Sequence, residues 1–313
     1  MSPAEGEWTL SYGANGLLPG AKITFGTWRT GHYLLEPVDI VYTDTDTGDV
    51  QMPRQDGIRL GLDYRGSATL TFEIGVDSVD EADTRLGRHG AVLERVSTLA
   101  QAWDAEAVRS RTAAPAVLST TQGGRARRFY GRPRRFAPAA SRLTRQGYTP
   151  VVATFVSVDG IAYDDTEQVG RVDLMPAPHR GLVGPLTTPL TMAGTASSRT
   201  PGAMVVGGNR PTWPVITIWG PISQPVVDVI GRWTLGLNLS LGPGEYVTID
   251  PRPWARTVLR NGGASVAGAL YRGAPLMPQM RLAPGPLTVV LRGNDDTGTA
   301  HMTVAWRNAF SYL

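Results

Sequence analysis

The stretch Trp233-Thr234-Leu235-Gly236-Leu237-Asn238-Leu239-Ser240-Leu241 alternates apolar and polar residues without a break. Side chains along a β-strand point to opposite faces in turn, so the tryptophan and the leucines would share one face of a sheet. A sheet with one apolar and one polar face is typical of antiparallel structure. The stretch therefore predicts an antiparallel sheet in this half of the chain.

Short strand candidates separated by turns continue beyond this stretch. Residues 246–249, 257–259, 287–291 and 302–306 are rich in apolar and β-branched residues. Turn clusters of Gly, Pro, Asn and Asp divide them at residues 242–244, 261–263 and 294–298. Because each apolar face must be covered by another layer, we expect the C-terminal half to form a sandwich of two antiparallel sheets.

The N-terminal half also begins with strand candidates. In residues 68–74, Leu70, Phe72 and Ile74 alternate with polar residues and would face a core. Several short strands are expected between residues 21 and 77, with turns at 44–49, 55–57 and 64–67. The Asp-rich turn 44–49 lacks the ligand pattern of a calcium loop, because Gln55 stands at the twelfth position where a glutamate is required. We interpret it as a hairpin tip.

One long helix is expected at about residues 80–110. Apolar residues recur there at steps of three and four, as on one face of a helix, and they are Leu86, Leu93, Val96, Ala100, Trp103 and Ala107. Ser78-Val79-Asp80-Glu81 has the pattern of a capping box before it. The chain as a whole is therefore predicted to be mainly β, with this helix in its N-terminal part.

A domain junction is expected near Arg180. Residues 175–211 are rich in Pro, Gly, Ser and Thr, which is the composition of a linker. We place an N-terminal domain at residues 1–179 and a C-terminal domain at residues 180–313.

The composition excludes several classes of protein. The 313-residue chain is 42% hydrophobic and 18% charged, which is typical of a folded globular protein. It has no cysteine, so disulfides, thiol nucleophiles and Cys-ligated metals are excluded. Its one lysine, Lys22, follows alanine, whereas a Walker A phosphate loop requires glycine there. The start MSPAEGEW lacks the features of a signal peptide and no apolar run could span a bilayer, so we expect no secretion by that route and no membrane insertion.

Several short motifs follow one another through most of the chain. The first half contains Gly131-Arg132-Pro133-Arg134, Arg145-Gln146-Gly147-Tyr148 and Tyr163-Asp164-Asp165. The second half contains Gly208-Asn209-Arg210-Pro211-Thr212-Trp213-Pro214, Trp219-Gly220-Pro221, Gly244-Glu245-Tyr246-Val247-Thr248-Ile249-Asp250 and Trp306-Arg307. Their order resembles the distal tail protein of long-tailed bacteriophages, the siphophages, of the kind called minor tail protein in actinobacterial phages. The sequence departs from the family in having arginine after Asn209, where glycine is expected.

The resemblance implies an N-terminal belt domain that closes into a hexameric ring around the tail lumen, and a galectin-like C-terminal sandwich. Such a ring would lie at the distal end of the tail in the virion and connect the tail tube to the baseplate or tail-tip hub. The implied partners are further copies of the chain, the major tail tube protein, the hub or baseplate protein and the tape measure protein. A receptor-binding protein or a host-surface glycan is a further candidate. The resemblance implies a structural protein, with no catalytic residues, cofactor or metal.

An arginine-rich segment is the candidate subunit interface. Residues 125–136 interleave aromatic residues with six arginines, Arg125, Arg127, Arg128, Arg132, Arg134 and Arg135. This composition also suits nucleic acid, but arginine is favoured in partly buried ion pairs between proteins. The acidic residues Asp44, Asp46, Asp49 and Glu81 of a neighbouring subunit would be suitable partners. We therefore assign these arginines to a subunit interface, with a solvated face as the alternative, and expect no specific nucleic-acid binding.

Two other functions stay open. A carbohydrate-binding module that recognises the host cell surface would stack aromatic rings on sugars, and the C-terminal half holds Trp213, Trp219, Trp233, Trp254 and Trp306. Most of these lie on alternating apolar faces and are expected in the core, whereas Trp254 lies in a proline-broken stretch and is the candidate glycan contact. A glycosidase would need two carboxylates that converge from distant strands, which sequence spacing cannot reveal. No nucleophile elbow, zinc-protease or dinucleotide motif occurs, and the four histidines are too far apart to suggest a metal site.

Overall fold

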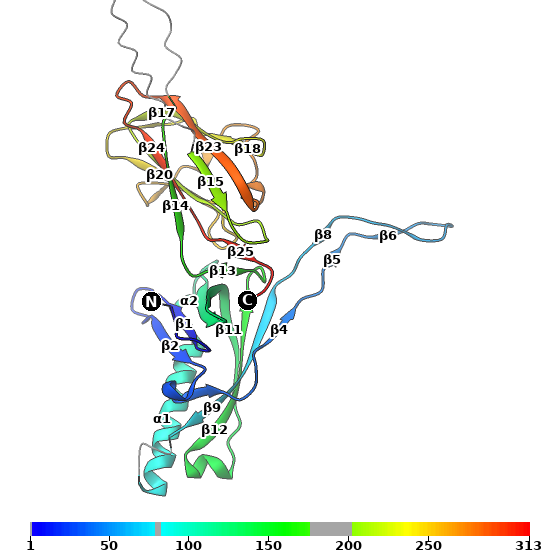
Figure 1. The fold of residues 1–313 in the computed structure, drawn as a ribbon, viewed down its shortest axis with the longest axis vertical. Helices are drawn as coiled ribbons and strands as arrows, with labels where there is room; N and C mark the ends of the chain where they lie inside the picture. The colour runs from blue at the N-terminus through cyan, green and yellow to red at the C-terminus, as the bar shows by residue number, and fades with distance from the viewer. Residues whose placement is uncertain (1, 79–82, 176–201) are drawn as a thin grey trace, which may run out of the picture. The chain divides into compact units, whose positions relative to one another are not determined.

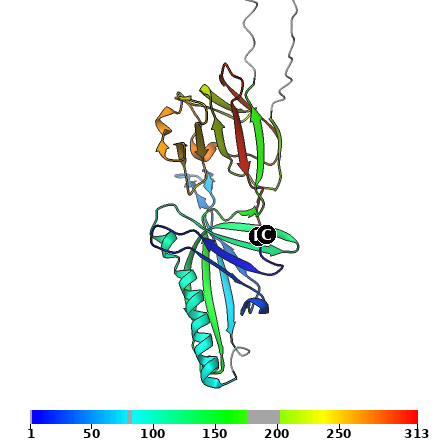
Figure 2. The same ribbon diagram turned by 90° about the vertical axis from the view of Figure 1, so that its left-hand side faces the viewer.

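The computed structural model describes residues 2–78, 83–175 and 202–313, which form two compact units (Figures 1 and 2). The first unit comprises Met1–Thr166 with Phe310–Leu313, and the second comprises Glu167–Ala309. Antiparallel strands dominate both units, so the protein is mainly β as predicted.

The first unit is built on one antiparallel sheet. Its strands lie in the order β2 (Ala21–Phe25), β1 (Trp8–Tyr12), β10 (Ala116–Gln122), β11 (Arg125–Pro138), β12 (Tyr148–Ser157), β9 (Ala68–Asp77) and β3 (His32–Leu34). In addition, β4 (Asp39–Tyr42) pairs with β9, and β13 (Ala162–Asp164) pairs with β11. The strand predicted at residues 68–74 is the first part of β9, and its alternate residues Leu70, Phe72 and Ile74 are buried as expected.

Gly26 joins the two ends of this sheet. Its amide donates to the carbonyl of His32 at 2.7 Å, and its carbonyl accepts from the amide of Leu34 at 3.2 Å. Its φ is +125°, a backbone conformation that side chains rarely adopt, so glycine is needed here. The sheet thus closes around a core rich in aromatic residues, which are Trp8, Phe25, Phe72, Trp103, Phe129 and Phe155.

Two helices, α1 (Arg85–Asp104) and α2 (Glu106–Arg109), occupy the region predicted as one helix. Ala105 separates them with a left-handed φ of 46°. Helix α1 begins later than predicted, because Thr84 is its N-cap and the Thr84 hydroxyl accepts from the amide of Gly87 at 3.1 Å. Residues 79–82, which hold most of the predicted capping box, lie outside the described residues.

The apolar stripe of α1 also differs from the predicted one. Val92, Leu99 and Trp103 are buried and Val96 packs against them, which is the i, i+4, i+7, i+11 pattern of a single helix face. Leu86 and Leu93 are 82% and 49% exposed, so their assignment to the stripe was wrong. Leu93 directly follows the buried position 92, and successive helix residues point about 100° apart.

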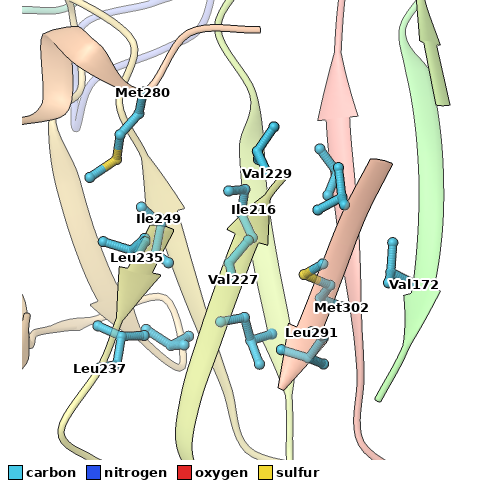
Figure 3. Packing of buried hydrophobic residues seen from close by; sticks show 14 of the residues in the cluster. Val172, Ile216, Val227, Val229, Leu235, Leu237, Ile249, Met280, Leu291 and Met302 are labelled. Atoms are coloured by element: carbon cyan, nitrogen blue, oxygen red, sulfur yellow. The ribbon is translucent and has the colours of Figure 1, made fainter. Parts of the chain in front are cut away.

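The second unit is a sandwich of two antiparallel sheets. One has the strand order β14 (Gln168–Asp173), β24 (His301–Trp306), β16 (Val215–Trp219), β20 (Tyr246–Asp250), β21 (Thr257–Arg260) and β22 (Ala264–Ser265). The other has the order β15 (Gly202–Val206), β23 (Gly285–Asn294), β17 (Ile222–Val229) and β18 (Trp233–Gly236), and β19 (Ser240–Leu241) also pairs with β17. Aliphatic side chains from both sheets meet in the core that Figure 3 shows, including Ile216, Ile249, Val227 and Leu291. The described residues also form the 3-10 helices η1 (Trp28–Thr30), η3 (Arg142–Gln146), η4 (Ala267–Ala269) and η5 (Met277–Gln279), and the short strand β25 (Ala309–Phe310).

The alternating stretch 233–241 faces the core as predicted. Leu235, Leu237 and Leu241 are at most 3% exposed, and Trp233 and Leu239 pack against them. The strand itself is interrupted after Gly236, where Leu237 forms an isolated bridge with Leu270 before β19 resumes at Ser240. The alternation therefore predicted the orientation of the side chains correctly over a break in the strand.

The two units divide at a different place from the predicted junction. Residues 176–201, which include Arg180, lie outside the described residues. In the described chain the second unit already begins at Glu167, because β14 pairs along its whole length with β24. Strand β14, which we had placed in the N-terminal domain, therefore belongs to the second unit.

Candidate assembly surface

A long two-stranded arm leaves the sheet of the first unit where β4 and β9 begin their pairing (Figure 1). Its strands are β5 (Asp46–Thr47) paired with β8 (Asp63–Tyr64), and β6 (Val50–Gln51) paired with β7 (Ile58–Arg59). Between these two pairs, Gly48 and Gly61 approach so closely that a Cβ on Gly61 would overlap the Gly48 carbonyl. The tip is the turn between β6 and β7.

The returning strand of the arm carries exposed apolar residues at alternate positions, Ile58, Leu60, Leu62 and Tyr64, which we call the apolar stripe. The pairing register shifts by one residue between the β5–β8 pair and the β6–β7 pair, so Ile58 and Tyr64 do not keep the alternation of one regular strand. The exposed fractions of the four side chains are 51%, 76%, 75% and 64%. The intervening residues 59, 61, 63 and 65 are Arg, Gly, Asp and Arg. An isolated hairpin is marginally stable in water, and exposed apolar side chains of this kind are typical of an interaction surface.

The arm corrects one interpretation of the sequence. Residues 44–49 are not a hairpin tip but lie on the outgoing strand of the arm, and Asp46 and Thr47 form β5. Residues 64–67 likewise belong to the returning strand and not to a separate turn. The signal in the sequence that indicates the arm is the alternate placement of Ile58, Leu60, Leu62 and Tyr64.

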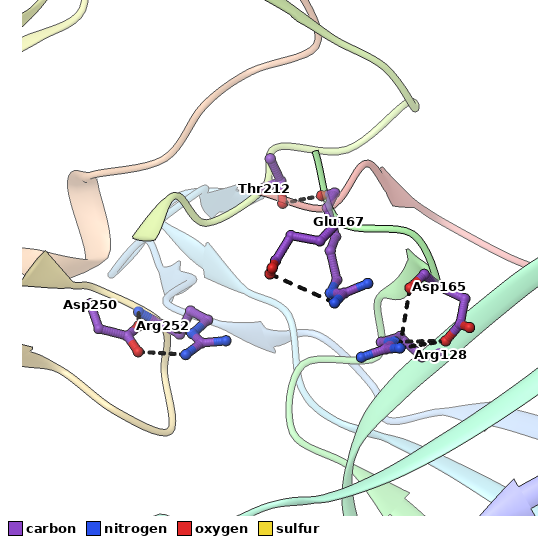
Figure 4. A network of polar contacts seen from close by, with 7 residues as sticks. Arg128, Asp165, Glu167, Thr212, Asp250 and Arg252 are labelled. Carbon is purple, nitrogen blue, oxygen red and sulfur yellow. Dashed lines mark hydrogen bonds and ion pairs between the residues drawn. The ribbon is translucent and has the colours of Figure 1, made fainter. Parts of the chain in front are cut away.

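Two of the six predicted interface arginines are held by neighbours within the first unit. Arg127 is buried, forms an ion pair with Asp164, and lies with its guanidinium 3.7 Å from the centre of the Phe310 ring. Arg128 donates to the Asp165 carboxylate through Nε at 2.9 Å and Nη2 at 2.6 Å (Figure 4). Neither of these acidic residues was among the partners proposed from sequence.

Of the other four arginines, one is held by backbone carbonyls of the first unit and three are exposed. Arg132 donates through Nε to the carbonyl of Ala114 at 2.9 Å, and through Nη2 to the carbonyl of Arg111. Arg125, Arg134 and Arg135 are exposed, the last two at an irregularity between Pro133 and Phe136 where the register of β11 against β12 shifts. The six arginines therefore do not form one surface, and their role at a subunit interface stays a prediction.

Trp254 is half-buried in the second unit. The guanidinium of Arg252 lies 5.6 Å from the centre of its ring, and Arg252 is held by the Asp250 carboxylate at 2.6 and 2.8 Å (Figure 4). The glycan contact at Trp254 stays a prediction. Trp213 and Trp306 are buried, consistent with the core placement expected for most of the tryptophans.

Within the described residues, no group of three or more His, Asp or Glu side chains is arranged to hold a metal ion. No helix in that part of the chain is both long enough and apolar enough to cross a bilayer.

The solved structures that match this chain over most of its length include two phage proteins. The SPP1 Dit (gp 19.1) protein, described as a paradigm of the hub adsorption apparatus in Gram-positive infecting phages, is 14% identical with a TM-score of 0.55, and the match covers 89% of this chain and 93% of that one. A chain of the phage P2 baseplate in its activated conformation with Ca is 8% identical with a TM-score of 0.52, covering 98% of this chain and 99% of that one. No family model and no curated protein matches the sequence. The chain therefore shares the fold of phage Dit and baseplate proteins.

Proposed function

We propose that this chain is a structural component of a phage tail tip, a distal tail protein that assembles into a ring between the tail tube and the baseplate or tail-tip hub. The fold shared with SPP1 Dit and with a phage P2 baseplate chain supports this role. The sixfold copy number, the actinobacterial type and the galectin-like character of the second unit come from the sequence resemblance. The proposed role requires no catalytic residue or cofactor.

The apolar stripe of the arm is the observation that carries the proposal. Burying a large aliphatic or aromatic side chain contributes about 1.5–3 kcal/mol, so covering all four would contribute on the order of 6–12 kcal/mol before the cost of association. Within the described residues these four side chains are left at least 51% exposed. A neighbouring copy of the chain is the partner that a ring would supply.

A ring requires two unlike, complementary surfaces on each subunit. The arm provides one of them. The tail tube protein, the hub or baseplate protein and the tape measure protein would contact other faces of the ring, and the exposed Arg125, Arg134 and Arg135 are candidate contacts.

The proposal is tested by the mass of the purified protein in solution, followed by electron microscopy of the large species. We expect a closed ring for the unaltered chain and a monomer for the double variant Leu60→Asp, Leu62→Asp, because charges on the stripe cannot be buried against an apolar partner. The matched control is Leu276→Asp, which changes a leucine that is 68% exposed in the second unit and should leave the ring intact. A ring that persists unchanged in the arm variant would contradict the assigned role of the arm, and a chain that stays monomeric at every concentration would contradict self-assembly.

A further inference from the structure

Three aromatic side chains lie side by side on one sheet of the second unit, on the face that points away from the core. Trp219 of β16 lies opposite His301 of β24 on one side and opposite Tyr246 of β20 on the other, so the three side chains share a face. Ile218, which precedes Trp219, is fully buried in the core, so Trp219 points the opposite way. We call these three side chains the aromatic row.

The rings of the aromatic row are packed against one another. The Trp219 ring lies 4.6 Å from the Tyr246 ring and 6.2 Å from the His301 ring, centre to centre, at angles of 39° and 12°. All three side chains are half-buried, so part of each is accessible. Neighbouring rings on a paired sheet hold each other in place, so a ligand that contacts them does not have to order them first.

Each ring carries an accessible polar atom for which the described residues provide no hydrogen-bond partner. These atoms are Nε1 of Trp219, the hydroxyl of Tyr246 and Nε2 of His301, whose Nδ1 donates to the carbonyl of Thr299 at 3.3 Å. None of the three atoms is fully buried. The row therefore offers a donor, a hydroxyl that both donates and accepts, and an acceptor.

A row of threonines runs beside the aromatic row on the same face. Thr217 lies opposite Thr303 on one side and opposite Thr248 on the other, two residues along each strand from the aromatic side chains. The hydroxyls of Thr217 and Thr248 lie 3.3 Å apart. Together the two rows place aromatic carbon next to uncharged groups that can hydrogen-bond.

The arginines that adjoin these rows are already paired with carboxylates. Arg171 of β14 lies opposite Thr303, and its Nε lies 3.1 Å from the Asp173 carboxylate. Nη2 of Arg260 in β21 lies 2.5 Å from the carboxylate of Glu245, the residue before β20. Neither guanidinium is left without a carboxylate.

The turn that leads into His301 adds negative charge. Asp295 is held by the amides of Thr299 and Ala300 at 2.8 and 2.9 Å, and Asp296 is exposed. A ligand that carries phosphate or carboxylate groups would meet these acidic side chains without an unpaired arginine to bind it. An uncharged ligand avoids this repulsion.

We propose that the aromatic row and the adjoining threonines bind a neutral oligosaccharide. Sugar rings present C–H faces that pack against aromatic carbon, and hydroxyls that donate and accept hydrogen bonds, which matches the groups on this face. The site is separate from the glycan contact predicted at Trp254, whose ring lies beside the Arg252 guanidinium. The inference does not depend on ring formation.

Binding of defined sugars to the full chain, measured by isothermal titration calorimetry, tests the proposal. The neutral probes are chitotetraose, maltotetraose, mannotetraose and galactotetraose, and polyglycerol phosphate is the anionic probe. We expect at least one neutral tetrasaccharide to bind with a millimolar or lower Kd and polyglycerol phosphate not to bind. Failure of every neutral probe, or binding of polyglycerol phosphate alone, would overturn the proposal.

Variants of the row locate the binding site. Tyr246→Phe removes only a hydroxyl that has no partner among the described residues, so the melting temperature should be unchanged while Kd rises about two- to tenfold. Trp219→Ala removes the central ring and should raise Kd at least about tenfold.

The matched control is Trp254→Ala, which removes the other candidate tryptophan and should leave Kd unchanged. Circular dichroism confirms that each variant remains folded. Unchanged affinity in both Tyr246→Phe and Trp219→Ala would overturn the proposed site. A loss of binding confined to Trp254→Ala would assign the glycan contact to Trp254 instead.

Discussion

The Asp295 carboxylate organises the turn between β23 and β24. It accepts from the amides of Thr297 and Thr299 at 2.8 Å and of Ala300 at 2.9 Å, and from the Thr297 hydroxyl at 2.7 Å. Burial alone would raise the pKa of Asp295, but these hydrogen bonds hold it below its ordinary value. A pKa lower in the folded state than in the unfolded state means that the ionised form stabilises the fold.

We therefore expect the stabilisation from Asp295 to be complete at neutral pH and to be lost as the pH falls below about 4, the ordinary range of an aspartate. Asp295→Asn should lower the free energy of unfolding of the second unit by about 1–2 kcal/mol at pH 7 and by less at pH 3. Urea unfolding at the two pH values measures the difference. An equal loss at both would show that the charge contributes nothing.

The ion pair between Arg127 and Asp164 indicates that Arg127 stabilises the first unit, which differs from the interface role predicted for it. Arg127 is 7% exposed, and its pKa is lowered first by burial and then by the charge of Arg125. Asp164→Ala would leave this buried charge without its carboxylate, at a cost of roughly 3–5 kcal/mol in the free energy of unfolding of the first unit. Arg125→Ala, at an exposed position, is the control and should cost little. A small loss for Asp164→Ala would show that this ion pair contributes little to the stability of the first unit.

At the scale of elements, sequence periodicity predicted strands well and their surroundings less well. Leu70, Phe72 and Ile74 alternate and are buried in the subunit's own core, whereas Ile58, Leu60, Leu62 and Tyr64 alternate in the same way and are exposed. Alternation of apolar and polar residues predicts a strand, and it does not predict whether the apolar side chains are buried within the same chain. The helix was also predicted from its periodicity. The residues assigned to its buried face were partly wrong, because a single apolar residue such as Leu93 fits more than one helical phase.

The close approach of Gly48 and Gly61 allows the arm to be tested as an element. A methyl group at Gly61 would overlap the Gly48 carbonyl, so Gly61→Ala should disrupt the pairing of the arm strands. Neither arm strand contributes to the core of the first unit, so its melting temperature should be unchanged while ring assembly weakens. Gly13→Ala is the control, because a Cβ there meets nothing within 4 Å. Normal assembly of Gly61→Ala would show that the arm need not be paired to function.

At the scale of the whole molecule, composition alone could not place the division of the chain. The segment rich in Pro, Gly, Ser and Thr suggested a junction near residue 180, but the second unit begins at Glu167 because β14 (Gln168–Asp173) pairs with the distant β24 (His301–Trp306). Such pairing depends on contacts between residues distant in sequence, which local patterns do not encode. The return of Phe310–Leu313 to the first unit was missed for the same reason.

This return makes the stability of the first unit depend on the last part of the chain. The Phe310 ring lies under the Arg127 guanidinium at 3.7 Å, and the Tyr42 hydroxyl donates to the carbonyl of Ser311 at 2.8 Å. Phe310→Ala removes both the cation–π contact and the partly buried ring, so it should lower the free energy of unfolding of the first unit by roughly 1–3 kcal/mol. Calorimetry at low protein concentration should then show an earlier transition for the first unit and an unchanged one for the second. Tyr312→Ala, at a side chain that is 58% exposed, should change neither transition. An unchanged first transition in Phe310→Ala would show that the Phe310 side chain contributes little to the stability of the first unit.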